Sequence, residues 1–454
     1  MTVVLYVLGV LFVALAVGAS IGLHEIGHLV PAKKFGVKVT QYMVGFGPTV
    51  WSRRRGETEY GIKWIPLGGY IRMIGMFPPR AGDKPGTLRV SSTGRFSQLA
   101  DEARQLSLEE IRPGDEDRVF YKLSVPKRVV VMMGGPMMNL LIAVVLLTGL
   151  VTLYGVSVPK PGAEVASVSE CVVPAAEATT KTACATTDPK TPAYQAGIHP
   201  GDVLVSVNGQ PVQRPADVGE LIRPRAGEAT SIVVRRDGKE LSLTATPVRN
   251  QVQRISPDGT PMVDAAGQPV TTEAGFLGVS SAPPLVIERQ PLSVVPQVVG
   301  HQLTATAGLV LKIPQKMKGV AEAAFGSGAR DPNGPVSVVG IGRFAGEASS
   351  GGIQGIGGED GIAPLAFLLQ LIAGLNMALF VFNMIPLLPL DGGHVAGALW
   401  EGLKRHTAKL LHRPDPGPVD VAKALPVAYA VSSVLIVMSV LLIYADIVKP
   451  INLG

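Results

Sequence analysis

Four long apolar runs dominate the sequence. Each has about the 20 mostly apolar residues needed to cross the hydrocarbon layer of a membrane. The runs lie at about Thr2 to Val30, Val129 to Tyr154, Ile362 to Ile385 and Leu425 to Ala445. Only 17% of the 454 residues are charged, which is low for a soluble or disordered chain. The pattern predicts a polytopic α-helical membrane protein with four transmembrane helices. With their flanking motifs, these are expected at 1–30, 129–154, 362–394 and 425–447.

Basic residues beside the runs predict how the chain crosses the membrane. The segment 31–128 carries 18 Lys and Arg against 10 Asp and Glu, whereas 155–361 carries 17 against 19. Because loops rich in Lys and Arg stay in the cytoplasm, we expect 31–128 and the short loop 395–424 to be cytoplasmic. Both termini and 155–361 are then expected outside, in a multi-pass protein of the cell membrane. The basic residues form no dense stripe with interleaved aromatic residues, which disfavours a nucleic-acid partner.

The first run also resembles a signal peptide in its position. It has no basic segment before it and no small-residue cleavage site after it, and its apolar stretch is too long. We therefore expect it to remain in the mature protein.

The outer segment from Ala163 to Arg249 resembles a PDZ domain. From Ala193 it reads Ala-Tyr-Gln-Ala-Gly-Ile-His-Pro-Gly-Asp-Val-Leu-Val-Ser-Val-Asn-Gly, where alternating valines predict a strand and Asn208-Gly209 a tight turn. The resemblance implies an extracytoplasmic β-rich domain inserted between the second and third spans. Such a domain either binds a peptide or a free C-terminus, or acts as a size filter, and the residues do not choose between these roles.

The rest of the outer segment, 250–361, is rich in Gly and Pro and is expected to be a linker. Its Val298 to Val320 portion is predicted to be an amphipathic helix that lies on the membrane surface. Cys171 and Cys184 fall in the outer segment, where disulfides are permitted, so a bridge is slightly favoured over two free thiols.

Near the inner end of the first span stands the motif His24-Glu25-Ile26-Gly27-His28. On a helix, His24 and His28 share one face, so both imidazoles can reach a single Zn²⁺. Glu25 lies beside them as the candidate general base. Ionisable groups at membrane depth are costly and usually functional, which favours a zinc site over polar residues on an interfacial helix.

Two histidines leave a catalytic zinc site short of one protein ligand. The third span ends in a polar stretch with Pro386 and Pro389, which cannot continue a helix. Irregular backbone at membrane depth is tolerated only where it faces protein or a wet cavity, so a polar site is expected there. Asp391 is the only carboxylate in this span or its exit, which favours it as the third ligand. His394 is the alternative.

Together these motifs resemble the site-2 protease family of zinc intramembrane metalloproteases. The likeness rests on HExxH in the first span, N-x-x-P-x-x-P-L-D-G-G in the third and the PDZ-like domain between spans two and three. It extends to three shorter motifs, at Gly45 to Pro48, Gly134 to Asn139 and Gly334 to Ser337. The resemblance implies a zinc endopeptidase that cleaves transmembrane segments of single-span membrane proteins within the lipid bilayer.

The stretch from Phe46 to Met76 is closest to actinobacterial members that act on anti-sigma factors. The resemblance therefore implies a bacterial source and anti-sigma factors as substrates. Two other functions are weighed, a catalytically inactive membrane PDZ scaffold and a zinc transporter. An inactive relative would be expected to lose a motif residue, and a transporter does not need Glu25 at that spacing.

The cytoplasmic loop contains a predicted membrane-associated β-hairpin at about 56–76. We expect it to dip back toward the active site and to bind extended substrate by strand addition, although a purely structural hairpin is the alternative. The candidate substrate-binding residues in it are Tyr60, Ile62, Ile71 and Met73. The charged stretch 78–118 that follows is expected to be a linker without fixed structure.

Two further sets of residues have open roles. The resemblance implies that Asn383 binds the substrate backbone, while a hydrogen bond that packs two helices explains this residue as well. Gly134, Gly135 and Asn139 in the second span are expected to be close-packing residues where helices meet.

Overall fold

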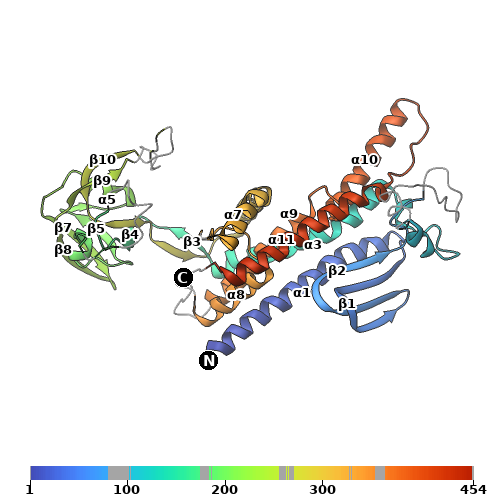
Figure 1. Ribbon diagram of the computed structural model, residues 1–454, viewed down its shortest axis with the longest axis horizontal. Coiled ribbons are helices and arrows are strands. Elements are labelled where there is room, and N and C mark those ends of the chain that lie inside the picture. Colours follow the sequence, from blue (N-terminus) through green and yellow to red (C-terminus); the bar gives the residue numbers. More distant parts are fainter. Residues whose placement is uncertain are drawn as a thin grey trace. The chain divides into compact units, whose positions relative to one another are not determined.

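The computed structural model describes residues 2–79, 102, 104–173, 184–185, 187–254, 262, 264, 270–326, 328, 330–352 and 363–451. The chain separates into two compact units. Unit 1 comprises Met1–Tyr154 and Gln290–Gly454, and unit 2 comprises Gly155–Arg289. Figure 1 shows that unit 1 is mainly helical and that unit 2 is mainly strands.

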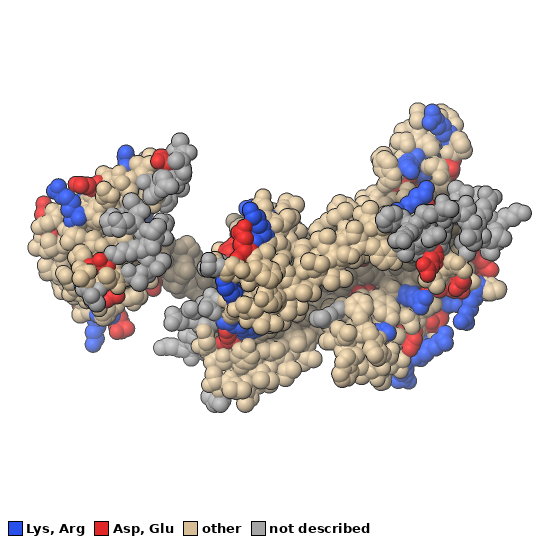
Figure 2. Space-filling model, viewed as in Figure 1, with Lys and Arg blue, Asp and Glu red and all other residues tan. Residues whose placement is uncertain are grey.

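Unit 1 is built on long apolar helices. The described part of the chain holds five helices that are long and apolar enough to cross a membrane, which fits a multi-pass membrane protein. They contain α1 (Thr2–Lys34), α3 (Val125–Gly149), α6 (Val295–Leu311), α9 (Ala363–Asn383) and α11 (Leu425–Val448). The four expected spans coincide with four of these helices. On the face shown in Figure 2, the middle of the long helices of unit 1 is nearly free of charged side chains.

The fifth apolar helix differs from the prediction of four spans and one amphipathic surface helix. The Val298 to Val320 stretch lies in two helices, α6 and α7 (Ile313–Phe325), because Pro314 in the first turn of α7 supplies no N–H to continue α6. Splitting the segment leaves α6 as an apolar helix of its own. The count of four candidate helices is therefore not confirmed.

Shorter helical elements complete unit 1. They are α8 (Val338–Ser350), α10 (Asp391–Leu410), the short turns η1 (Phe120–Lys122), η3 (Leu292–Val294) and η4 (Val421–Ala424), and η2 (Leu150–Tyr154), which prolongs α3. The buried Arg128 on α3 forms an ion pair with the buried Glu401 on α10. This pair fixes α10, whose first residue is Asp391, against α3.

The predicted hairpin folds as β1 (Val39–Arg55) and β2 (Thr58–Met73). Each of these strands bends, so that each pairs along two stretches. Tyr42 lies opposite both Ile71 and Tyr60, and the register places residues 49–55 beside 58–63. The sheet order is therefore 49–55, 58–65, 39–46 and 69–73, with 49–55 and 69–73 at its edges. Gly45 and Gly68 permit the bends, since they adopt φ values of 96° and 107° that only glycine takes readily.

Part of the charged stretch 78–118 is folded, which corrects the expectation of an unstructured linker for that part. The backbone N–H of Lys38 donates to Arg118 at 3.1 Å, and the guanidinium of Arg118 pairs with Glu57 at 2.6 Å. Arg104 pairs with Asp420 in the loop before α11 at 2.6 Å. These contacts attach residues 104–118 to the sheet and to the loop before α11, while 80–101 and 103 lie outside the described residues.

Unit 2 contains the strands predicted for the PDZ-like segment. Its main sheet has the order β11-β4-β5-β7-β8, with β6 paired to β5. The strands of this sheet are β4 (Ala163–Val168), β5 (Val203–Val207), β6 (Gln210–Pro211), β7 (Thr230–Arg236), β8 (Lys239–Ala245) and β11 (Val279–Ala282). Two helices complete the unit, α4 (Pro192–Gln195) and α5 (Pro215–Ile222), together with two two-stranded sheets. One sheet pairs β3 (Val156–Pro159) with β12 (Leu285–Glu288), and the other pairs β9 (Val248–Gln253) with β10 (Thr271–Phe276).

The sheet of unit 2 is wider than the predicted 163–249 segment, because β11 comes from the stretch expected to be linker. A disulfide joins Cys171 to Cys184, as favoured from the sequence. The identification of the unit as a PDZ domain stays a prediction.

Candidate metal centre

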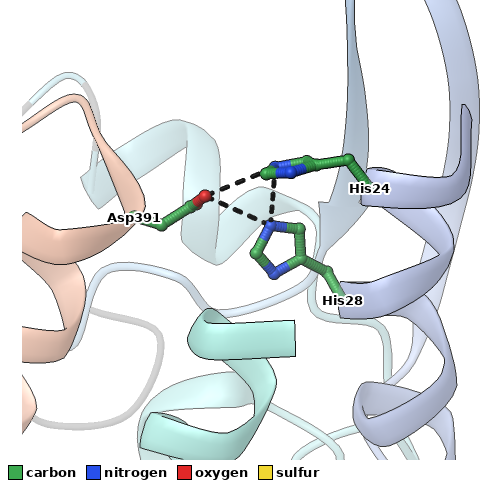
Figure 3. A group of neighbouring side chains, drawn as sticks. All are labelled: His24, His28 and Asp391. Carbon is green, nitrogen blue, oxygen red and sulfur yellow. Dashed lines mark hydrogen bonds and ion pairs between the residues drawn. The ribbon is translucent and has the colours of Figure 1, made fainter. Parts of the chain in front are cut away.

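Helix geometry brings the two histidines of the HExxH motif together. They project from the same face of α1 near its C-terminal end, and their Nε2 atoms lie 3.2 Å apart. His28 is 5% exposed. Figure 3 shows both imidazoles turned toward the carboxylate of Asp391.

Asp391 reaches the histidines because the chain breaks at the end of α9. Residues 384–390 form turns, and α10 begins at Asp391, so this carboxylate lies at a helix start rather than inside a span. Its Oδ2 atom is 3.3 Å from Nε2 of His24 and 3.4 Å from Nε2 of His28. The converging group of potential ligands consists of these three residues, and His394 is not part of it among the described side chains.

The three ligand atoms fit a tetrahedral zinc ion. Zinc binds imidazole nitrogen and carboxylate oxygen at about 2.0–2.2 Å, so two such atoms at tetrahedral corners lie about 3.3–3.6 Å apart. The observed separations are 3.2, 3.3 and 3.4 Å. Two nitrogens and one oxygen are also the donor set of many catalytic zinc sites, which keep a fourth position open.

The space in front of the histidines is kept clear by a glycine. A Cβ atom on Gly135 of α3 would lie 2.2 Å from Nε2 of His28 and 2.7 Å from Nε2 of His24. Gly134, its neighbour, packs against the backbone of Gly27, where a Cβ atom would fall 1.9 Å from the Gly27 carbonyl oxygen. The expectation of close packing describes Gly134 well, whereas Gly135 also borders the ligand atoms.

Each histidine has a partner on α3 at its other ring nitrogen. Nδ1 of His28 donates to the carbonyl oxygen of Val131 at 2.8 Å, and Nδ1 of His24 lies 3.1 Å from the side-chain amide of Asn139. The atom of Asn139 nearest to it is Nδ2, while Oδ1 of Asn139 is buried without a partner among the described residues. Exchanging the two ends of this amide brings Oδ1 to the ring, so that Nδ1 of His24 donates to it. Partners of this kind hold the ring so that Nε2 faces the metal. The role of Asn139 was missed in the sequence, where its position four residues after Gly135 was the available signal.

Glu25 is buried beside the three ligands, with 7% of its surface exposed. It packs against the outer strand 69–73, because a Cβ atom on Gly69 would lie 2.9 Å from its Cγ atom. A backbone hydrogen bond from Ile71 also reaches its carboxylate. The candidate base therefore lies between the histidines and one edge of the β1–β2 sheet.

The candidate substrate-binding residues are divided between inner and outer strands. Tyr60 and Ile62 lie in 58–65, whose backbone is paired on both sides and is therefore not open to strand addition. Their role in substrate binding stays a prediction. Ile71 and Met73 lie in the edge strand 69–73, and the side chain of Met73 is buried in the core. Asn383 is the last residue of α9, where the turn toward Asp391 begins.

Comparison with known proteins agrees with this geometry. The model of peptidase family M50 matches residues 12–412. The zinc metalloprotease Rip1 of Mycobacterium tuberculosis is 33% identical over 452 residues, which cover 99% of both chains. Rip1 of Mycolicibacterium smegmatis is 33% identical over 455 residues, which cover 98% of both chains. The chain therefore belongs to peptidase family M50, which confirms its resemblance to the site-2 proteases.

Proposed function

We propose that this chain, a zinc metalloprotease by its family, cleaves peptide bonds within the transmembrane segments of single-span membrane proteins. The observation that carries the proposal is the convergence of His24, His28 and Asp391 from two of the long apolar elements, α1 and the break after α9. A hydrolytic site built from such helices is suited to substrates that are themselves in the bilayer.

His24, His28 and Asp391 would hold the zinc ion through Nε2, Nε2 and Oδ2. When bound, zinc supplies Lewis acidity, which lowers the pKa of water toward ~7 and polarises a peptide carbonyl. Val131 and Asn139 fix the ring orientation of the two histidines. The absence of a Cβ atom at Gly135 leaves room for water and substrate.

Glu25 acts as the general base. Its carboxylate takes a proton from the attacking water, whose oxygen bonds to the carbonyl carbon of the substrate. As the C–N bond breaks, Glu25 gives the proton to the leaving amine. Its burial beside the ligands places the carboxylate where it can serve both steps.

The edge strand 69–73 presents the substrate in extended form. A membrane helix hydrogen-bonds its own backbone, so it must unwind before a carbonyl is available for attack. Within the described parts of the chain, residues 69–73 pair with a strand on one side only, and they contact Glu25 through Gly69 and Ile71. An unwound segment that pairs with this edge gains main-chain hydrogen bonds beside the base. We propose that Asn383 also contacts the substrate backbone.

The proposed membrane topology rests on charge. The basic loops favour an orientation with the triad toward the cytoplasmic side and unit 2 outside the cell membrane. Unit 2 is then available to a peptide or a new C-terminus of the substrate through its PDZ-like fold. Anti-sigma factors are the proposed substrates, as the resemblance of the Phe46 to Met76 region implies.

We further propose that α6 does not cross the bilayer. The chain just before α6 is attached to the end of α3. The N–H of Gln290 donates to the carbonyl oxygen of Val151, in the η2 turn that prolongs α3, at 3.0 Å. Beyond the end of α6, Lys312 lines a cavity together with Arg330, which pairs with Asp446 near the end of α11. The predicted topology puts the ends of α3 and α11 on the same face, so both ends of α6 belong to that face.

Cleavage by purified full-length chain in proteoliposomes tests the proposal. A single-span substrate is reconstituted with the wild type or with Glu25→Gln, which keeps the zinc ligands. Because the base is lost, we expect cleavage inside the span to fall about 10²–10⁴-fold while zinc content, measured by plasma mass spectrometry, stays the same. Equal cleavage by both forms would contradict the role of Glu25. Zinc uptake into vesicles without any cleavage by the wild type would instead indicate a transporter.

A further inference from the structure

A second polar site lies in unit 1, away from the triad. A cavity of about 210 Å³ opens between α7 and the loop before α8. Its lining consists of Lys312, Gln315, Lys316, Gly319, Val320, Arg330, Asp331 and Gly334. Three of these side chains are basic and one is acidic. Figure 2 shows charged side chains of both signs on the α7 region.

Arg330 is the buried charged residue of this lining, with a side chain that is 4% exposed. Its Nη2 atom donates to Oδ1 of Asp446 at 2.8 Å and to the carbonyl oxygen of Pro335 at 2.7 Å. Its Nε and Nη1 atoms have no hydrogen-bond partner within the described parts of the chain. Buried donors without an acceptor are costly, and each one in a native protein calls for a missing partner such as an ion.

The charges around the cavity favour an anion. Asp446 offsets Arg330, and Lys316 donates to Oδ2 of Asp331 at 2.6 Å. Lys312 then remains without an acidic partner among the described residues. A planar guanidinium matches the oxygens of a phosphate, and an ammonium group adds a point charge.

The surroundings of the cavity are those of a membrane interface. Lys312 directly follows the apolar helix α6, and Lys449 directly follows α11 and donates to the carbonyl oxygen of Gly326 at 2.6 Å. Exposed apolar side chains lie on the same elements, and Phe325 of α7 stacks on Tyr444 of α11 with ring centroids 5.4 Å apart. These exposed residues are Leu309, Leu311, Phe325, Tyr444 and Ile447. Aromatic residues at such a boundary are typical of the headgroup level of a bilayer.

We propose that this cavity binds the phosphate of a glycerophospholipid headgroup. The phosphate oxygens accept from Nε and Nη1 of Arg330 and from Nζ of Lys312, while the acyl chains lie along the exposed apolar faces of α6 and α11. An anionic headgroup binds more tightly than a choline headgroup, because the choline cation meets the charge of Lys312. The bound lipid joins α7 to the loop 330–334, and so holds the end of α11 in place through Asp446.

Lipid binding to the purified full-length chain in dodecyl maltoside tests the proposal. Dioleoyl phosphatidylglycerol, dioleoyl phosphatidylcholine, dioleoylglycerol and inorganic phosphate are each titrated, and bound lipid and thermal midpoint are recorded by native mass spectrometry and by intrinsic fluorescence. We expect phosphatidylglycerol to raise the midpoint most, phosphatidylcholine less, and the two remaining probes not at all.

Two variants are compared with the wild type. Arg330→Lys keeps a positive charge that can pair with Asp446 but loses the planar guanidinium donors. Lys312→Gln leaves every hydrogen bond described above intact. The matched control is Lys318→Gln on α7. The side chain of Lys318 is 80% exposed and does not line the cavity. Loss of one charge-assisted contact should weaken phosphatidylglycerol binding about tenfold in the first two, and not in the control.

Several results would overturn the assignment. If dioleoylglycerol stabilises the chain as well as phosphatidylglycerol does, the acyl chains alone account for binding. If inorganic phosphate raises the midpoint equally, the site takes a free anion and not a lipid. If Lys312→Gln binds phosphatidylglycerol as the wild type does, the cavity is not the site, and this holds even where Arg330→Lys fails to fold.

Discussion

Gly135 of α3 stands so close to His28 of α1 that a Cβ atom on it would lie 2.2 Å from the Nε2 atom. Two helices can approach this closely because Gly134 and Gly27 also face each other without side chains. The contact places the ligand atoms of α1 beside the partners of both histidines on α3. Helix packing and the metal centre thus depend on the same short glycine-rich segment.

The first prediction follows from this contact. In Gly135→Ala, the new methyl group occupies the space in front of Nε2 of both histidines, so we expect zinc content and cleavage to be lost. Gly149→Ala on the same helix is the control, since a Cβ atom there meets nothing within 4 Å. Zinc is measured by plasma mass spectrometry, with the thermal midpoint as a check on folding. Full zinc content in Gly135→Ala would show that the ion lies elsewhere.

The second prediction decides the third zinc ligand. We expect about one zinc ion per chain, lost in His24→Ala or His28→Ala and strongly weakened in Asp391→Ala, because three protein ligands are usual at a catalytic site. His394→Ala should keep its zinc, since this side chain is not in the converging group of described residues. The opposite pattern, with zinc lost in His394→Ala and kept in Asp391→Ala, would assign the ligand to His394.

The third prediction concerns Asn139 as a positioning residue. In Asn139→Ala, His24 loses the acceptor at Nδ1, so its ring is free to turn away. Loss of such an outer contact typically costs 10–100-fold in metal affinity or activity, and we expect a change of about that size in zinc affinity. Competition with a chelator measures it. Asn139→Asp should restore tight binding because it supplies an acceptor, and weak binding by that variant too would speak against an orienting role.

The fourth prediction separates substrate pairing from base chemistry. In a Glu25→Gln background, a further Ile71→Pro change removes an N–H from the edge strand without removing a bond between strands, because that N–H faces Glu25. We expect the amount of single-span substrate that stays bound to the uncleaving protein to fall at least about tenfold, with zinc content unchanged. Arg53→Pro, on the opposite edge of the same sheet, is the control. Equal retention in both variants would make the hairpin merely structural.

The strand-addition mechanism also predicts how the cleavage rate depends on the sequence of the substrate span. Helix-breaking residues added to the substrate span should speed cleavage by wild-type protein, since less unwinding remains to be done. An unchanged rate would mean that unwinding does not limit the reaction.

The fifth prediction concerns topology. The chain has two cysteines, which are joined in a disulfide, so introduced cysteines can be labelled without background. In intact cells, an impermeant maleimide should reach cysteines at Lys239 and Lys312 and should not reach one at Arg54. All three positions are exposed. Labelling at Arg54 and not at Lys239 would reverse the orientation. Labelling at Lys239 but not at Lys312 would show that α6 crosses the membrane.

Local pattern was enough for several features of this protein. The spacing of His24, Glu25 and His28 determines one helix face, because residues four apart on an α-helix are neighbours whatever surrounds them. The apolar runs predicted α1, α3, α9 and α11 on length alone, since the bilayer sets the length of a spanning helix. The alternating valines and the Asn208-Gly209 turn likewise predicted β5 and its hairpin.

Other features depend on residues far apart in the chain, and the tertiary structure decided them. Asp391 rather than His394 converges with the histidines because the break after α9 and the Arg128–Glu401 pair set how α10 lies on α3. The edge position of 69–73 follows from bends that let each strand pair twice, so an inner strand holds Tyr60 and Ile62. Spacing along a chain predicts neighbours within one helix or hairpin, whereas which helices meet, and which strand stays unpaired, depends on the packing of all of them at once.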